Sequence, residues 1–117
     1  MRYLMLIRFD PAVAPTAGPD PSLAEGMGRL IEEMTKAGVL LDTAGLRPIE
    51  EATRIRLAGG TTTILDGPFI ESKEVIGGYC LVQTRSREEA VEWGSRFLRL
   101  HGPEWTMEVE IRQLDQS

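Results

Sequence analysis

The chain of 117 residues is poor in the residues that most often carry catalysis, since it has one cysteine and one histidine. The single cysteine, Cys80, excludes an intrachain disulfide, which is typical of a reducing compartment. Because Cys80 stands in an apolar run, we interpret it as an inert core residue. One histidine and one core cysteine also argue against a nucleophilic triad or a metal centre, so we expect no metal and no cofactor.

Basic charge and long apolar runs are scarce as well. Thirteen Lys and Arg residues stand against 18 Asp and Glu, and the net charge of −5 argues against nucleic acid as a partner. No apolar run approaches the ~20 residues that span a bilayer, and "MRYLMLIRFD" at the start lacks the small-residue cleavage site of a signal peptide. We therefore expect a cytoplasmic protein without a membrane partner, folded as one domain over residues 1–117.

The first segments alternate between apolar and breaker-rich stretches. "YLMLIRF" (residues 3–9) is apolar on both alternations, which predicts a central strand buried on both faces. "DPAVAPTAGPDP" (residues 10–21) holds four prolines and cannot form regular structure. Its length leaves two interpretations open, a surface excursion or a binding loop.

Two amphipathic helices are predicted. Ser22 and Glu25 form the spacing of a capping box at the first helix, which should end at Gly38. Ser86 and Glu89 repeat that spacing at the second helix, where His101 is interpreted as a charge partner of the helix end. The predicted inner stripes are Leu23, Met27, Leu30, Ile31 and Met34 in the first helix, and Ala90, Val91, Gly94, Phe97 and Leu98 in the second.

The remaining segments predict strands. "VLLDTAGL" (residues 39–46) and "GGYCLVQT" (residues 77–84) are apolar, and Gly59-Gly60 joins two β-rich runs as a hairpin turn. "WTMEVEIRQL" (residues 105–114) alternates strictly between apolar and polar residues, which indicates a strand near an edge.

The order βαβ-hairpin-βαβ predicts an α+β, ferredoxin-like fold: an antiparallel sheet with two helices on one face. The chain is too short to supply a layer for the other face, although the first strand places apolar side chains there. Because an uncovered apolar face is typical of a partner surface, we expect a homodimer that packs sheet on sheet.

The segment "LDGPFIESKEVIGGY" (residues 65–79) resembles the signature of the YCII-related family in its DGPF-type branch. The resemblance extends over nearly the whole chain, through "AGVLLDTAGLRP", "EEAVEW" and "MEVEIRQL". It implies a dimeric α/β barrel, and genes that often neighbour those of extracytoplasmic-function sigma factors. More distant members use a His–Asp pair whose histidine lies in or before the first helix. This chain has no histidine there.

Within this segment, each residue has a structural and a functional interpretation. Asp66, with Gly67, Pro68 and Phe69, forms a turn, or aims a carboxylate oxygen into a pocket. Gly77-Gly78 indicates a bulge or a close approach of other groups. The phenol of Tyr79 either contacts a ligand or points to the barrel edge.

Two functions remain open on these residues. One is a small enzyme for a modest organic molecule, with Asp66, Lys73 and Glu71 as catalytic candidates, since residues 71 and 73 share one side of an extended segment. Its ligand would be bound by Asp66, Gly67, Phe69, Lys73 and Tyr79. The alternative is a ligand-sensing protein without catalysis, acting as a partner in a sigma-factor-linked pathway.

Overall fold

The computed structural model describes residues 1–15, 20–69 and 74–115 of the chain. Its elements are β1 (Arg2–Phe9), α1 (Pro21–Lys36), β2 (Leu40–Gly45), a short 3-10 helix η1 (Ile49–Glu51), β3 (Thr53–Ala58), β4 (Thr61–Asp66), β5 (Val75–Gln83), α2 (Arg87–Arg99) and β6 (Met107–Gln113). The order βαβ-hairpin-βαβ expected from the sequence is confirmed.

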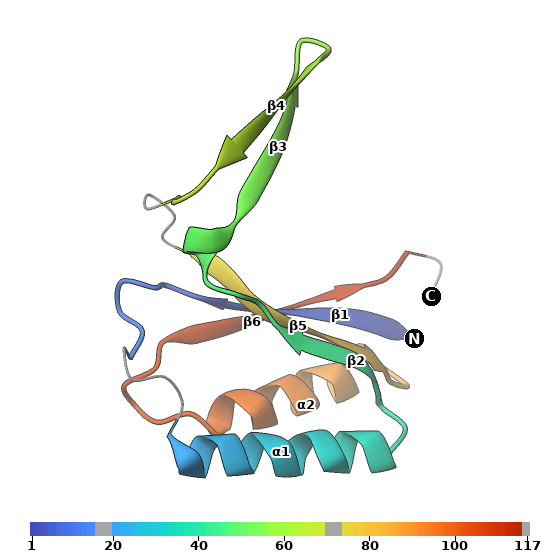
Figure 1. Cartoon of the computed structure of the whole chain (residues 1–117). Helices are drawn as coiled ribbons and strands as arrows, with labels where there is room; N and C mark the ends of the chain where they lie inside the picture. Colours follow the sequence, from blue (N-terminus) through green and yellow to red (C-terminus); the bar gives the residue numbers. More distant parts are fainter. Residues whose placement is uncertain (16–19, 70–73, 116–117) are drawn as a thin grey trace.

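Four strands form an antiparallel sheet in the order β2-β5-β1-β6. Both helices lie against one face of this sheet, and the other face is open in the part of the chain described here (Figure 1). This is the ferredoxin-like α+β arrangement, with the hairpin β3–β4 added between β2 and β5.

The position of β1 follows from its apolar pattern. It lies between β5 and β6, as expected for a strand apolar on both alternations. Tyr3 and Met5 are buried toward the helices, whereas Leu4 and Leu6 alternate to the open face and are half-buried. The buried core between sheet and helices consists of Tyr3, Met5, Leu30, Met34, Val39, Val82 and Ala90.

The predicted capping box of Ser22 and Glu25 at the start of α1 is wrong. The N-cap is Asp20, whose Oδ1 accepts a 2.8 Å hydrogen bond from the backbone N–H of Leu23. Aspartate is a strong N-cap and Pro21 is favoured at the first helical position, so together they outcompete the serine. The end of the helix is as predicted, since Gly38 follows the C-cap with a φ of 72°.

The start of α2 is as predicted, because the Ser86 hydroxyl accepts a 3.1 Å hydrogen bond from the N–H of Glu89. Its inner stripe is displaced from the predicted one. Val91 is exposed, and Trp93, which the pattern did not include, packs against the core. Ala90, Trp93 and Phe97 keep the helical spacing, so the stripe is centred beside Val91 rather than on it.

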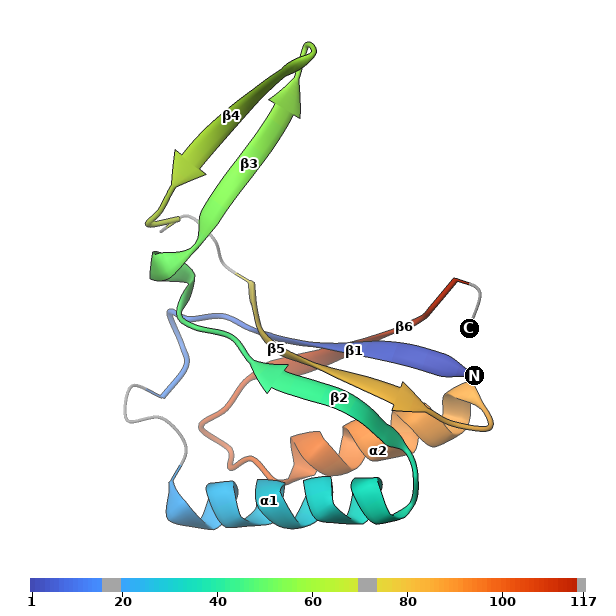
Figure 2. The ribbon, with the colours of Figure 1, turned by 45° about the vertical axis from the view of Figure 1, so that its right-hand side comes forward.

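The hairpin β3–β4 is a separate two-stranded sheet. Its turn contains Gly59 and Gly60 with φ values of 57° and 78°, the left-handed conformations that a tight hairpin turn requires. Every residue of β3 is exposed. The hairpin extends away from the four-stranded sheet on the side opposite the helices (Figures 1 and 2).

The predicted bulge at Gly77-Gly78 is confirmed. Ile7 pairs with Gly78 and Arg8 with Ile76, so Gly77 is the extra residue in β5. Gly78 also meets the neighbouring strand closely, since a β-carbon there would lie 2.9 Å from the carbonyl oxygen of Ala44.

Candidate functional site

Asp66 is the last residue of β4, and the chain bends at Gly67 at the base of the hairpin. Asp66 is exposed, and its Oδ1 accepts a 3.2 Å hydrogen bond from the Thr53 hydroxyl on the neighbouring strand. The N–H of Gly67 donates to the carbonyl oxygen of Ala52 at 3.1 Å. A β-carbon at Gly67 would lie 3.1 Å from the carbonyl oxygen of Glu50, so this close approach favours glycine. The chain therefore bends at this motif, and the partner of the Asp66 side chain is the Thr53 hydroxyl on the neighbouring strand, not the backbone N–H two residues on that a turn of this kind predicts.

Phe69 packs against Arg54 of β3 near the base of the hairpin. Its side chain is buried, and the guanidinium carbon of Arg54 lies 3.8 Å from the ring centroid, a cation–π arrangement. The predicted pair of Glu71 and Lys73 lies outside the described residues, and its role remains a prediction.

The phenol of Tyr79 lies on the open face of the sheet. It donates a 2.8 Å hydrogen bond to Oδ2 of Asp42 on β2. This hydrogen bond and the negative charge of Asp42 raise the pKa of Tyr79 above its ordinary value, because ionisation would remove the donated proton beside a carboxylate.

Arg8 lies on the same face and pairs with two carboxylates, Glu110 at 2.8 Å and Glu74 at 3.4 Å. The hydrogen bond that Arg8 donates to Glu110 and the charge of Glu74 raise the pKa of the guanidinium. This face of the sheet therefore carries the ion pairs of Arg8 as well as the hydrogen bond between Tyr79 and Asp42.

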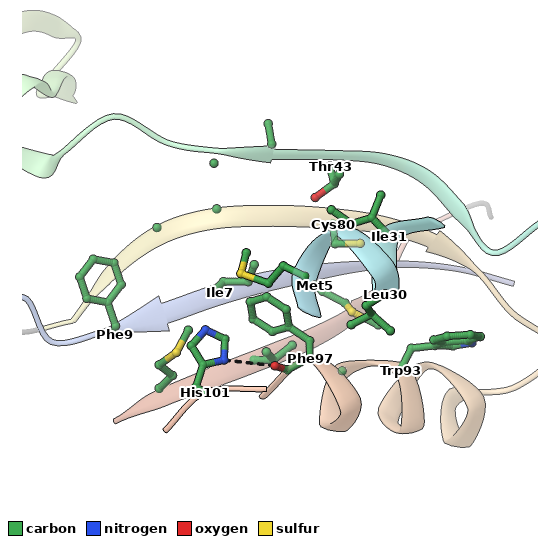
Figure 3. Close-up of a pocket in the computed structure, with 18 of the residues that line it drawn as sticks. Met5, Ile7, Phe9, Leu30, Ile31, Thr43, Cys80, Trp93, Phe97 and His101 are labelled. Atoms are coloured by element: carbon green, nitrogen blue, oxygen red, sulfur yellow. Dashed lines mark hydrogen bonds between the residues drawn. The ribbon is translucent and has the colours of Figure 1, made fainter. Parts of the chain in front are cut away.

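A cavity of about 400 Å³ lies on the opposite side, between the sheet and the two helices (Figure 3). Its volume falls within the range of small-molecule sites. Its walls are mainly aliphatic and aromatic side chains from β1, α1, α2 and β6, among them Met5, Phe9, Leu30, Trp93, Phe97 and Val109. Asp66, Gly67, Phe69 and Tyr79 do not line this cavity.

Two features expected from the sequence do contribute to the cavity. Ala14 and Pro15 of the proline-rich segment are part of its wall, so the described portion of that loop is more than a surface excursion. Gly77 and Gly78 line it too, and Phe9 occupies the space that a side chain at Gly77 would need. The glycine pair therefore connects the motif of residues 65–79 with the cavity.

Besides the indole groups of Trp93 and Trp105, three polar side chains lie in the cavity wall: Thr43, Cys80 and His101. The Thr43 hydroxyl donates to the backbone oxygen of Tyr79 at 2.9 Å, so its hydrogen is already engaged. Burial raises the pKa of the Cys80 thiol above its ordinary value of 9.0, which keeps this group protonated and unreactive at neutral pH.

His101 follows α2 and lies at one end of the cavity (Figure 3). Its Nδ1 is 3.1 Å from the carbonyl oxygen of Phe97, so the predicted contact with the helix end is present. The ring also packs edge-on against Phe97 and Trp105, with centroids 5.0 and 5.4 Å apart. These contacts hold the imidazole in one orientation.

The sequence interpretation missed the place of His101, Cys80 and Trp93 in a cavity wall. A signal for two of them was present, because Trp93, Phe97 and His101 recur every four residues along α2 and its end. Such spacing is shared by ordinary core residues, and the hollow beside it depends on side chains from other elements.

Residues 1–15, 20–69 and 74–115 have neither a cluster of metal ligands nor a helix that could cross a membrane. No three His, Cys, Asp or Glu side chains among them are grouped to hold a metal ion. No helix among them is long and apolar enough to cross a membrane.

Two comparisons with known proteins identify the family of this chain. The model of the YCII-related domain matches residues 1–99. A protein of Rhizobium meliloti (strain 1021), described as uncharacterized, is 31% identical over 116 residues, which cover 97% of this chain and 92% of the relative. The chain therefore belongs to the YCII-related family.

Proposed function

We propose that the protein binds a small, largely apolar molecule in the cavity between the sheet and the helices. The observation that carries this proposal is the cavity itself, about 400 Å³ with mainly aliphatic and aromatic walls. A site of this kind gains affinity from burying apolar surface, and a few polar groups in its walls orient the ligand.

Binding is a better-supported conclusion than catalysis. Of the three polar side chains in the wall, Thr43 is hydrogen-bonded and Cys80 stays protonated, which leaves the imidazole of His101 as the one among them that could move a proton. A catalytic role of Asp66 would need a second site, since Asp66 does not line the cavity. A ligand sensor in a sigma-factor-linked pathway needs only the cavity, and it is the function we favour.

The test uses 5-fluorobenzothiophene, an apolar bicyclic probe without a hydrogen-bond donor, observed by its ¹⁹F resonance. Broadening of this resonance by the wild-type protein is expected. Gly45→Leu should remove it, because residue 45 shares the cavity face of β2 with Thr43 and a β-carbon there meets nothing within 4 Å.

The matched control is Gly28→Leu, which adds the same side chain at an exposed glycine outside the cavity. This variant should bind the probe as the wild type does. Equal binding by wild type and Gly45→Leu would place the probe elsewhere. Absence of binding to the wild type, both by this probe and by its N–H analogue 5-fluoroindole, would refute the proposal.

We also propose that the protein is a homodimer that packs through the open face of its sheet. Leu4, Leu6 and Leu81 form an apolar centre on this face, since Leu4 pairs directly with Leu81 on the next strand. They are half-buried within one chain, and neither helix covers them (Figure 2). A second copy would cover this surface and remove it from water.

The hairpin also supports a second copy of the chain as the partner. Ile55, Leu57 and Ile64 share one face of it, and their exposed fractions are 71%, 71% and 68%. A lone two-stranded ribbon is marginally stable in water, so an apolar face of this kind favours a covering surface. Because the hairpin extends on the open side of the sheet, a second copy seated there would lie beside it. Two-fold symmetry would give each chain the same contact.

Light scattering after size exclusion tests the dimer. The wild type should have twice the chain mass at micromolar concentration, and a monomer mass would contradict the proposal. Leu6→Asp places a charge in the apolar centre and should give a monomer. Val91→Asp is the matched control, an exposed apolar residue on α2, and should remain a dimer.

A further inference from the structure

The geometry points to a ligand that carries one hydrogen-bond donor, an N–H or O–H on an aromatic ring system, bound to Nε2 of His101. This inference rests on the ligand cavity proposed above and specifies the chemistry of what fills it. It starts from the hydrogen bond at the other ring nitrogen.

The tautomer of His101 follows from its partner. Nδ1 lies 3.1 Å from the carbonyl oxygen of Phe97, and a carbonyl oxygen can only accept a hydrogen bond. Nδ1 therefore carries the hydrogen. In the neutral imidazole Nε2 then has a lone pair and acts as an acceptor.

The acceptor is available to a ligand. No hydrogen bond to Nε2 occurs among the described residues. Every fully buried polar side-chain atom among them has a partner, so the unpaired Nε2 is not fully buried. Nε2 therefore remains accessible, and the residue that bears it lines the cavity (Figure 3). A ligand without a donor would displace water from this nitrogen and leave it unpaired, which costs binding free energy.

The other polar groups of the wall select against a charged or many-donor ligand. The Thr43 hydroxyl already donates to the backbone, and the protonated Cys80 thiol is a weak hydrogen-bonding group. Aromatic rings are well represented around the cavity, with Phe9, Trp93, Phe97 and Trp105 in the wall. Such rings pack well on a flat aromatic ligand.

The experiment compares two probes of nearly the same shape. 5-Fluoroindole has an N–H donor, and 5-fluorobenzothiophene has a sulfur atom in its place. Dissociation constants are measured by ¹⁹F NMR for wild type, His101→Asn and His101→Gln. Asn keeps a donor near the position of Nδ1 and removes the Nε2 acceptor, whereas Gln places an amide oxygen near the position of Nε2.

The ratio of the two dissociation constants isolates the hydrogen bond. His101→Asn should weaken 5-fluoroindole about fivefold relative to 5-fluorobenzothiophene, the size expected for one neutral hydrogen bond. His101→Gln should restore part of that preference. An unchanged ratio in His101→Asn would overturn the inference, while binding of 5-fluorobenzothiophene would still support the apolar cavity. If neither probe binds the wild type, the cavity proposal fails and this inference fails with it.

A second measurement needs no variant. Because the chain has one histidine, its ¹⁵N imidazole spectrum contains only the two resonances of His101. The Nε2 resonance should shift on addition of 5-fluoroindole and stay close to its position with 5-fluorobenzothiophene. A spectrum in which Nε2 carries the hydrogen, or equal shifts with both probes, would overturn the inference.

Discussion

Gly77 and Phe9 are so close that a β-carbon at residue 77 would lie 2.5 Å from Cε1 of the Phe9 ring. Gly77 is the extra residue of the bulge in β5, and Phe9 is the last residue of β1. The ring therefore lies where a side chain would otherwise stand, and both residues contribute to the end of the cavity.

Gly77→Ala should lower the free energy of unfolding by about 1–3 kcal/mol, because the methyl group forces the Phe9 ring to move in a packed site. Gly45→Ala is the control, since a β-carbon at that residue meets nothing within 4 Å. Its effect should be within about 0.5 kcal/mol. Urea unfolding of both variants measures the difference, and equal stability would contradict the close packing.

The hydrogen bond from Tyr79 to Asp42 predicts an alkaline effect. The pKa of Tyr79 is raised above its ordinary value of 10.0, so the folded state holds this proton more tightly than the unfolded state does. The stability that it contributes is present below pH 10 and is lost as the pH rises through the raised pKa. Asp42→Asn removes the negative charge and should lower the pKa.

Tyrosinate absorbance near 295 nm measures this titration, and Tyr79→Phe assigns the component because the chain has two tyrosines. In Asp42→Asn the Tyr79 component should appear at lower pH than in the wild type. An unchanged midpoint would show that the hydrogen bond is absent in solution.

Cys80 should react slowly with iodoacetamide. Burial raises the pKa of its thiol above 9.0, so the thiolate that attacks the reagent is scarcer in the folded protein than in urea. As the pH is raised, the increase in reaction rate should begin at a higher pH for the folded protein than for the unfolded chain. Because Cys80 lines the cavity, 5-fluorobenzothiophene should slow the reaction further. Mass spectrometry follows the modification, and Cys80→Ser is the unreactive control.

Asp66 tests whether the motif of residues 65–79 has a ligand role besides its turn. Asp66→Asn keeps an oxygen that can accept from the Thr53 hydroxyl and should cost under about 0.5 kcal/mol, whereas Asp66→Ala should cost about 1 kcal/mol. Both variants should bind 5-fluorobenzothiophene like the wild type, since Asp66 does not line the cavity. Loss of probe binding in a stable Asp66→Asn variant would assign the carboxylate a role in the ligand site.

The fold could be predicted because it depends on local patterns. The double alternation of residues 3–9 identified the central strand, and the two glycine pairs identified a hairpin turn and a bulge. The N-cap of α1 was misplaced because Asp20 and Ser22 are both good caps, and only the backbone geometry selects one of them.

The cavity could not be predicted in the same way. The high density of ionisable side chains in one stretch of sequence favoured Asp66, Glu71 and Lys73 as site residues. An apolar cavity has no such density, since its wall residues come from several elements and resemble core residues one by one. Whether Trp93 and His101 fill space or border it depends on the volumes of the side chains that the sheet and both helices contribute around them.

The hairpin has a consequence for variation in this chain. It leaves the four-stranded sheet after β2 and rejoins it at β5, and these two strands are themselves antiparallel neighbours. The hairpin is thus an extension inserted into a simpler connection. Residues added or removed in pairs, one in β3 and one in β4, would change its reach while the register of the four-stranded sheet stays the same. Its length can therefore change independently of the cavity, so the dimer and the ligand site proposed above could diverge separately.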